Sequence, residues 1–254
     1  MTRSRPTRPE SSAERFFLRQ PLQLATASPT DSVELEGSEA HHLLHVLRAS
    51  VGDQVGLFNG EGVEALAEIV AIKKRSATLR ITKAWIVPED ARGLVIATAL
   101  PKGDRARWLI EKATELGVSQ IIPLRTARSI VEPGESKLDK LEQAVITACK
   151  QCGRSRLMQI APLTSLSELL ASPAMQSRLA VIGDPSAQQS VAEVLSTQSE
   201  DSPATLAFIG PEGGFTSEEV NAAIAAGAKP VRLSTNILRI ETAAVVIASV
   251  WQVS

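Results

Sequence analysis

The sequence contains no tyrosine and few aromatic side chains of any kind. Its 254 residues include five phenylalanines and three tryptophans, and aromatics make up 3% of the chain. Stacking of a nucleobase on an aromatic ring is therefore less favoured here than in many base-binding proteins. The three histidines stand at positions 41, 42 and 45, so no residue after Val51 can supply an imidazole.

Cysteine is also scarce, and this argues against both a disulfide framework and a zinc site. The only two cysteines are Cys149 and Cys152. A structural zinc ion needs about four ligands, and no second cysteine pair or histidine cluster stands nearby in the sequence. The spacing places both thiols on the apolar side of one helix, so we interpret them as packed thiols and predict no metal site.

Long apolar runs are absent as well. No run reaches the roughly 20 residues that cross a bilayer, and the basic N-terminus lacks the apolar core of a signal peptide. The chain is 44% hydrophobic and 22% charged, as in ordinary soluble globular proteins. We therefore expect a cytoplasmic protein without membrane association, long enough for two domains.

The net charge of −1 argues against a protein coated in positive potential. Local clusters of arginine and lysine matter more for phosphate binding, because each neutralised phosphate releases counterions. Such clusters occur within residues 3–19, 73–75 and 102–107. A solvated surface is the alternative interpretation of any one of them.

The first part of the chain predicts a tail and a small β domain. Residues 1–13 are rich in Arg, Pro, Ser and Thr and predict a disordered tail. Residues 14–88 predict a small barrel, because short alternating segments are separated by Gly and Asn turns. The predicted strands cover residues 33–35, 54–58, 65–72 and 77–81. One short helix interrupts them, with Ser38 as its N-cap and His42, Leu43, Val46 and Leu47 on its turns.

After a linker at residues 88–93, the pattern in residues 92–254 predicts an α/β domain. Buried-strand runs alternate with helices, which indicates a parallel sheet covered on both faces. The predicted strands are residues 94–100, 118–124, 179–183, 205–210 and 230–234, and the helices include 104–116 and 137–152. Residues 243–251 form a helix that is apolar on nearly every face and must therefore be buried.

A glycine-rich segment follows the strand at 205–210. Gly210–Gly214 reads Gly-Pro-Glu-Gly-Gly, and Thr216 with Glu219 forms a capping box that starts a helix. Glycines at the carboxyl end of a strand let a ligand approach the backbone, and small molecules usually bind at that edge of an open sheet. The segment matches neither the dinucleotide fingerprint nor a phosphate loop. A plain tight turn is the alternative.

A second segment, residues 231–244, joins a strand to the last helix. The strand ends at Ser234, a loop carries Asn236 and Arg239, and a helix begins near Glu241. Burying an Arg-x-Glu sequence is costly unless the charges have partners. A structural ion pair between Arg239 and Glu241 is therefore an alternative to a functional role.

These two segments resemble the signatures of a known enzyme family. Residues 210–215 and 237–243 are similar to those of the ribosomal RNA small subunit methyltransferase E family, which methylates N3 of a uridine and belongs to the SPOUT superfamily. Further segments that match are residues 112–118, 151–154 and 42–48, the last followed by Gly52-Asp53. The resemblance covers nearly the whole chain after the tail, in the right order.

The resemblance implies a PUA-like barrel followed by a SPOUT-type α/β domain with a C-terminal trefoil knot, which periodicity alone would not suggest. It also implies a homodimer, 16S ribosomal RNA of the small subunit as substrate, and S-adenosylmethionine (SAM) as cofactor. The implied cofactor residues are Gly210, Glu212, Gly213, Leu233, Ser234, Ile237, Leu238 and Thr242. The implied catalytic residues, lying toward the RNA, are Arg154 and Arg239. The predicted RNA contacts are Arg15, Arg19, His42, Arg48, Lys102 and Arg105.

The sequence departs from the family pattern at two positions. Ser234 stands where the family usually has glycine in the cofactor loop, and Cys152 stands where serine is common. Serine is small enough to leave the backbone accessible, and the second change is expected to matter little.

The implied chemistry needs the N3 proton of uracil to leave, and a general base is the usual device. The second domain has neither histidine nor tyrosine. We infer that electrostatic stabilisation supplies the larger part of catalysis. Arg154 or Arg239, near the uracil carbonyls, would stabilise negative charge on the ring. The alternatives are a SPOUT methyltransferase acting on another RNA nucleotide and a non-catalytic RNA-binding relative.

Overall fold

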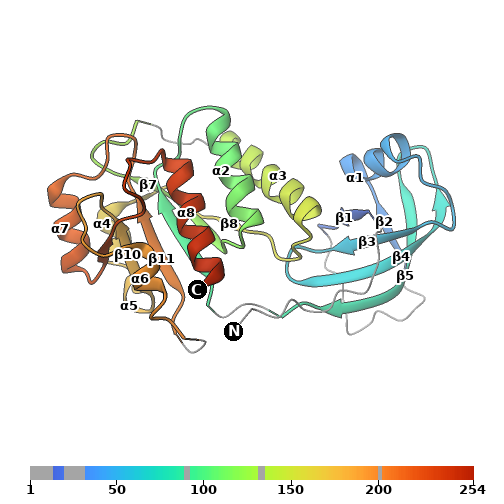
Figure 1. Cartoon of the computed structure of the whole chain (residues 1–254). Helices are drawn as coiled ribbons and strands as arrows, with labels where there is room; N and C mark the ends of the chain where they lie inside the picture. Colours follow the sequence, from blue (N-terminus) through green and yellow to red (C-terminus); the bar gives the residue numbers. More distant parts are fainter. Residues whose placement is uncertain (1–13, 20–31, 89–91, 131–134, 200–201) are drawn as a thin grey trace. The chain divides into compact units, whose positions relative to one another are not determined.

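The computed structural model describes residues 14–19, 32–88, 92–130, 135–199 and 202–254. The predicted tail, residues 1–13, lies outside the described residues, as do residues 89–91 of the predicted linker. The chain divides into two compact units (Figure 1). The first comprises residues 1–89 together with 149–157, and the second comprises residues 90–148 and 158–254.

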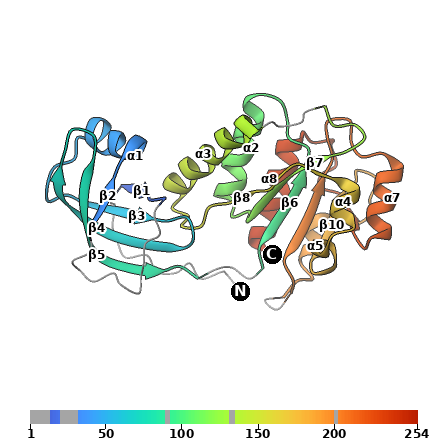
Figure 2. The same cartoon turned by 180° about the vertical axis from the view of Figure 1, so that it is seen from behind.

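The first unit is built on a curled five-stranded sheet (Figures 1 and 2). Its strands are β1 (Arg15–Phe17), β2 (Ser32–Leu35), β3 (Gln54–Phe58), β4 (Val63–Ile72) and β5 (Ala77–Ile86). Their order is β1-β3-β4-β5-β2, and β1 pairs with β3 in parallel while the other pairs are antiparallel. Two register shifts between β4 and β5 increase the local twist. The predicted PUA-like barrel is thus a curled sheet with β1 and β2 at its edges.

The short helix of this unit differs from the prediction at its start. It comprises α1 (Gly37–His41) and a π-helical turn, η1 (His42–Val46). The N-cap residue is Glu36, without a side-chain cap, so the prediction of Ser38 as N-cap was wrong. Its anchor in the core is Leu43, which is fully buried. The helix therefore begins where the chain leaves β2, and packing rather than capping holds it.

The second unit has a parallel sheet with the order β12-β10-β11-β6-β7-β8. The strands are β6 (Leu94–Thr98), β7 (Gln120–Arg125), β8 (Gln159–Ile160), β9 (Thr164–Ser165), β10 (Leu179–Gly183), β11 (Thr205–Ile209) and β12 (Lys229–Val231). The short β9 pairs with the end of β7. Because these strands are parallel, their carboxyl ends meet at one edge of the sheet.

Helices cover both faces of this sheet. They are α2 (Asp104–Glu115), α3 (Glu135–Cys152), α4 (Leu166–Leu170), α5 (Pro173–Gln176), α6 (Val191–Leu195), α7 (Ser217–Ala225) and α8 (Ile240–Val253). One face packs on α4, α5 and α7, while α8 lies on the other and contacts β6, β11, α2 and α6 (Figures 1 and 2). The predicted burial of the last helix is confirmed, since Ile247 and Ala248 are fully buried. The knot implied by the resemblance stays a prediction.

Candidate functional site

The glycine-rich loop connects β11 to α7 at the carboxyl edge of the parallel sheet. The predicted capping box is confirmed: the Thr216 hydroxyl accepts from Glu219 N at 3.2 Å, and the Glu219 carboxylate accepts from Thr216 N at 2.8 Å. The same carboxylate accepts from Ala127 N at 2.7 Å. The segment after β7 is therefore held against the start of α7.

Two glycines of this loop lie where a Cβ would make unusually tight contacts with neighbouring atoms. A Cβ on Gly210 would stand 3.0 Å from Phe215 N and 3.2 Å from Gly214 C, so the neighbouring backbone would have to shift to admit it. A Cβ on Gly213 would stand 3.2 Å from Cδ of Arg128, whose Nη1 donates to Gly213 O at 2.7 Å. Glu212 and Gly213 are exposed. The loop thus presents open backbone at the sheet edge.

The second loop, residues 232–239, runs from β12 to α8 at the same edge. Leu233 lies against the end of β10, because a Cβ on Gly183 would be 3.6 Å from Leu233 Cδ1. The Ser234 hydroxyl accepts from Asn236 N at 3.2 Å, so the serine that replaces the usual glycine closes a local turn. Ile237 is 87% exposed and available to a ligand.

Arg105, at the start of α2, connects the glycine-rich loop to the first turn of α8. Its Nη2 lies 3.2 Å from Glu212 Oε1 and its Nη1 lies 3.9 Å from Glu241 Oε1. Glu241 is only 7% exposed, and its Oε2 has no hydrogen-bond partner among the described residues. The cation beside Glu241 is therefore Arg105. The sequence had suggested an ion pair of Glu241 with Arg239 instead. Two carboxylates around one guanidinium leave a net negative charge.

We predict that Arg105→Ala lowers the free energy of unfolding by about 1–3 kcal/mol, because it leaves the buried Glu241 carboxylate without a cation. Urea unfolding of the two proteins measures this difference. Arg107→Ala is the matched control on the same helix, since the Arg107 side chain is 64% exposed in its pair with Glu111. The free energy of unfolding of Arg107→Ala should fall by less than about 1 kcal/mol. Equal losses for the two variants would show that Arg105 is an ordinary surface ion.

The remaining predicted residues lie in different places. Thr242 and Arg239 are exposed at the start of α8, and Leu238 is half-buried beside them. Lys102 is exposed between β6 and α2. The first unit holds the other predicted residues: Arg15, Arg19, His42, Arg48 and Arg154. The structure therefore brings the predicted cofactor residues to one sheet edge and places Arg154 in the other compact unit.

Within the first unit, the predicted RNA contacts differ in exposure. Arg19 and Arg48 are exposed, whereas His42 is half-buried and its ring centroid lies 5.9 Å from that of Phe16. The Arg15 side chain is only 15% exposed and pairs with Glu64 at 2.6 Å. Arg15 thus has protein partners, and Glu64 is a buried charged residue that sequence reasoning missed.

Arg154 lies in the loop after α3 and is half-buried. Burial lowers the pKa of its guanidinium, while the neighbouring Cys149 and Cys152 act in the opposite direction. An arginine nevertheless stays protonated in proteins, so Arg154 carries a positive charge. Both cysteines are free thiols. Cys149 is fully buried, in agreement with the packed-thiol interpretation, whereas Cys152 is half-buried.

The described part of the chain contains neither a cluster of potential metal ligands nor a helix that could span a membrane. No group of three or more His, Cys, Asp or Glu side chains in it could hold a metal ion. No helix there is long and apolar enough to span a membrane.

Comparison with known proteins agrees with this arrangement. The family described as RNA methyltransferase domain matches residues 88–252, and the RNA methyltransferase PUA domain matches residues 35–82. The chain is 30% identical to ribosomal RNA small subunit methyltransferase E of Bacillus subtilis, covering 91% of this chain and 92% of the relative. It is 29% identical to the enzyme of the same name from Synechocystis, covering 92% and 77%.

A solved structure extends the likeness to three dimensions. The ribosomal RNA small subunit methyltransferase E of Neisseria gonorrhoeae, crystallised with bound SAM, has a TM-score of 0.81 and 28% identity, over 93% of this chain and 95% of that one. The family match covers more than half of the chain, and the curated relative in Bacillus subtilis is similar along almost its whole length. The chain therefore belongs to the ribosomal RNA small subunit methyltransferase E family of RNA methyltransferases.

Proposed function

We propose that this protein transfers a methyl group from SAM to N3 of a specific uridine in 16S ribosomal RNA of the small subunit. The observation that carries the proposal is the meeting of both family signature segments, residues 210–215 and 237–243, at one edge of the parallel sheet. That edge is where open α/β sheets bind small ligands. The proposed substrate places the reaction in the cytoplasm.

The residues at this edge fit SAM. The cofactor is cationic at its sulfonium and ammonium groups, and the Glu212–Arg105–Glu241 cluster carries one more negative than positive charge. The buried Glu241 Oε2 also lacks a hydrogen-bond partner among the described residues. The residues that would hold the cofactor are Gly210, Glu212, Gly213, Leu233, Ser234, Ile237, Leu238 and Thr242. When bound, SAM supplies a methyl group on sulfur that needs little further activation.

In this reaction the protein orients the base and stabilises the negative charge that develops on it. Uracil N3 carries a proton at neutral pH and becomes a good nucleophile only when that proton leaves. The guanidinium of Arg154 or Arg239 would stabilise the charge that develops on the ring carbonyls. The second unit contains neither histidine nor tyrosine, so we assign the larger share of catalysis to this electrostatic effect and to positioning.

The proposed RNA surface is narrower than the sequence suggested. Arg19, Arg48 and Lys102 are exposed and remain proposed RNA contacts. His42 also remains, because its side chain is only half-buried. We leave out Arg15 and Arg105, because their guanidinium groups contact carboxylates of the protein itself. The division into residues 14–88 for RNA binding and 92–254 for catalysis stays a proposal. The first unit also includes residues 149–157, so this short segment is separated from the proposed catalytic domain.

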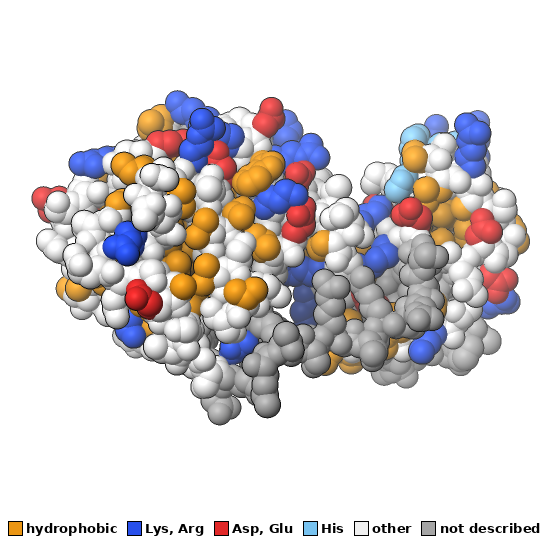
Figure 3. All heavy atoms as spheres, viewed as in Figure 1, with side chains coloured by type: hydrophobic (Ala, Val, Ile, Leu, Met, Phe, Trp, Pro, Cys, Tyr) orange, Lys and Arg blue, Asp and Glu red, His pale blue; other side chains and the backbone are white. Residues whose placement is uncertain are grey.

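We further propose that the protein is a homodimer through the outer face of α8. Three half-buried valines, Val245, Val246 and Val250, share that face of the helix with the small and equally half-buried Ser249. Figure 3 shows hydrophobic side chains gathered over the region where α8 runs. Apolar surface of this kind on a soluble protein commonly marks an interface.

Val246→Glu is expected to convert the dimer to a monomer, because a carboxylate buried without a partner in an apolar interface is costly. Light scattering coupled to size exclusion measures the mass. The control is Ile224→Glu on α7, where Ile224 is 43% exposed, and it should leave the mass unchanged. A wild-type monomer, or a dimer that tolerates the Val246 change, would refute the proposed interface.

The proposal is tested with small ribosomal subunits from a strain that lacks this protein. Incubation with the protein and SAM should add one methyl group per subunit RNA. A second candidate, methylation of another RNA nucleotide by the same fold, would give the same methyl count at a different base.

A further inference from the structure

The loop after α3, residues 153–157, is embedded in the sheet of the first unit although the chain reaches it only after the second unit has begun. Gly153, with φ of +81°, ends the helix, and its N–H donates to Cys149 O at 2.9 Å. A left-handed conformation of this kind favours glycine. The chain then turns directly into Arg154.

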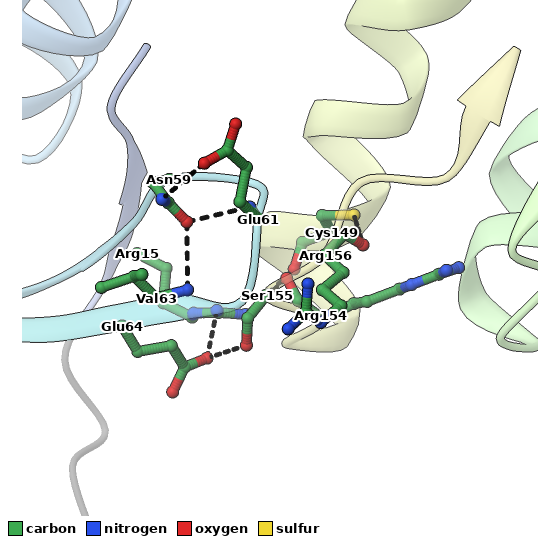
Figure 4. A network of polar contacts seen from close by, with 9 residues as sticks. All are labelled: Arg15, Asn59, Glu61, Val63, Glu64, Cys149, Arg154, Ser155 and Arg156. Carbon is green, nitrogen blue, oxygen red and sulfur yellow. Dashed lines mark hydrogen bonds and ion pairs between the residues drawn. The ribbon is translucent and has the colours of Figure 1, made fainter. Parts of the chain in front are cut away.

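The β3–β4 hairpin receives this loop through backbone hydrogen bonds. Gly62 N donates to Ser155 O at 3.3 Å, and Leu157 N donates to Gly60 O at 2.9 Å. The hairpin is itself shaped by Asn59, whose Oδ1 accepts from Glu61 N at 2.9 Å and Val63 N at 3.0 Å (Figure 4). The loop is therefore paired with a turn that has its own internal support.

A buried carboxylate fixes the loop immediately after Arg154. Glu64 on β4 is 5% exposed and Ser155 is 6% exposed. The Ser155 hydroxyl donates to Glu64 Oε1 at 2.5 Å, and Arg15 Nη2 donates to the same oxygen at 2.6 Å (Figure 4). Burial of a carboxylate is costly unless it is paired and hydrogen-bonded. Moving Ser155 away would remove one of the donors that offset this cost.

Arg15 fixes the loop from the other side. Its Nη1 donates to Cys149 O at 3.1 Å and to Arg154 O at 3.4 Å. Its guanidinium also lies 4.6 Å from the centroid of the Phe58 ring, which is fully buried. One planar guanidinium thus joins the last turn of α3, the Arg154 carbonyl and the Glu64 carboxylate. Arginine suits such a role because its donors are fixed in one plane.

Arg154 lies between these two attachment points. Its own carbonyl accepts from Arg15, and the hydroxyl of the next residue donates to Glu64. Figure 4 shows the Arg154 side chain extending away from Glu64 and Ser155. The backbone at Arg154 is therefore fixed while its guanidinium remains directed away from the cluster that fixes it.

We propose that Arg15, Glu64 and Ser155 are positioning residues that hold Arg154 in its catalytic orientation. Arg15 would then act through Arg154 without contacting RNA. This inference rests on the proposed role of Arg154 at the nucleobase. A displacement of about 1 Å in such a group can cost about 100-fold in rate, so even a small movement of the loop should be measurable.

The test is a double-mutant cycle in the full-length protein, with single-turnover methyl transfer to small-subunit RNA at saturating SAM. Ser155→Ala alone should lower the rate by about 10- to 100-fold and leave the SAM dissociation constant unchanged. In an Arg154→Ala background, the same change should lower the rate no further, because no guanidinium remains to be positioned. Glu64→Gln should behave like Ser155→Ala, and it provides a second variant if one of them folds poorly.

Arg80→Ala is the control on the same sheet, because the Arg80–Glu68 pair is exposed and the loop is not among its contacts. It should leave the rate unchanged. Equal rate losses from Ser155→Ala with and without Arg154 would overturn the positioning role, and so would an unchanged rate in both Ser155→Ala and Glu64→Gln. An unchanged rate in Arg154→Ala alone would instead refute the proposed role of Arg154, so the two failures are distinguishable.

Discussion

Gly213→Val is expected to weaken SAM binding by at least about 100-fold, or roughly 3 kcal/mol, while the protein stays folded. Valine at this position must displace the Arg128 side chain, which lies 3.2 Å from the position of the new Cβ, and with it the 2.7 Å bond from Arg128 to Gly213 O. Its two methyl groups would also fill the space above an open stretch of backbone. Isothermal calorimetry with SAM measures the effect.

The fold should tolerate this substitution because Gly213 is exposed and does not have a positive φ. Circular dichroism and the melting temperature check this point. Ala222→Val, at an exposed position of α7, adds a similar volume and should leave SAM affinity unchanged. Unchanged affinity in Gly213→Val would show that the cofactor does not approach the glycine-rich loop.

Arg154→Ala should lower the single-turnover methyl-transfer rate by about 10²–10³, the usual cost of losing a donor that stabilises developing charge. SAM affinity should be unchanged, because the proposed role of Arg154 is at the nucleobase. Arg154→Lys should recover only part of the rate, since a guanidinium can present two parallel donors to a base edge and an ammonium cannot. A variant that loses SAM affinity together with rate would place Arg154 at the cofactor instead.

The pH dependence of the same rate distinguishes an arginine from a histidine mechanism. If deprotonation of uracil N3 depends on bulk pH and a neighbouring guanidinium, the rate should rise through the neutral range without an inflection from an imidazole. Rates of the wild type, His42→Ala and His45→Ala across pH measure this. An inflection that disappears in either histidine variant would bring an imidazole of the first unit into the reaction.

Local sequence signals predicted the cofactor edge well. The capping box of Thr216 and Glu219 depends on residues three apart, and the strand before the loop is an uninterrupted buried run. The same local signal occurs at Ser165 with Glu168 and at Ser190 with Glu193. Sequence reasoning did not use it there, so α4 and α6 were missed although their capping boxes are readable from the chain.

Long-range contacts account for what the sequence did not predict. Strand β12 ends at Val231, three residues before the predicted Ser234, because Arg232 N donates to Gln189 O and the chain leaves the sheet there. The placement of residues 149–157 in the first unit rests on bonds such as Arg15 to Cys149 O, which joins residues 134 positions apart. Periodicity cannot detect such a pairing, because it reads only residues that are close in the chain.

The measurement that most directly tests the proposed function is nucleoside mass spectrometry of small-subunit ribosomal RNA from a strain lacking this protein and from its parent. We predict that 3-methyluridine is present at one position in the parent, absent in the deletion strain, and restored by the wild-type protein but not by Gly213→Val. Retention of 3-methyluridine in the deletion strain, or loss of a different methylated nucleoside, would contradict the proposed reaction.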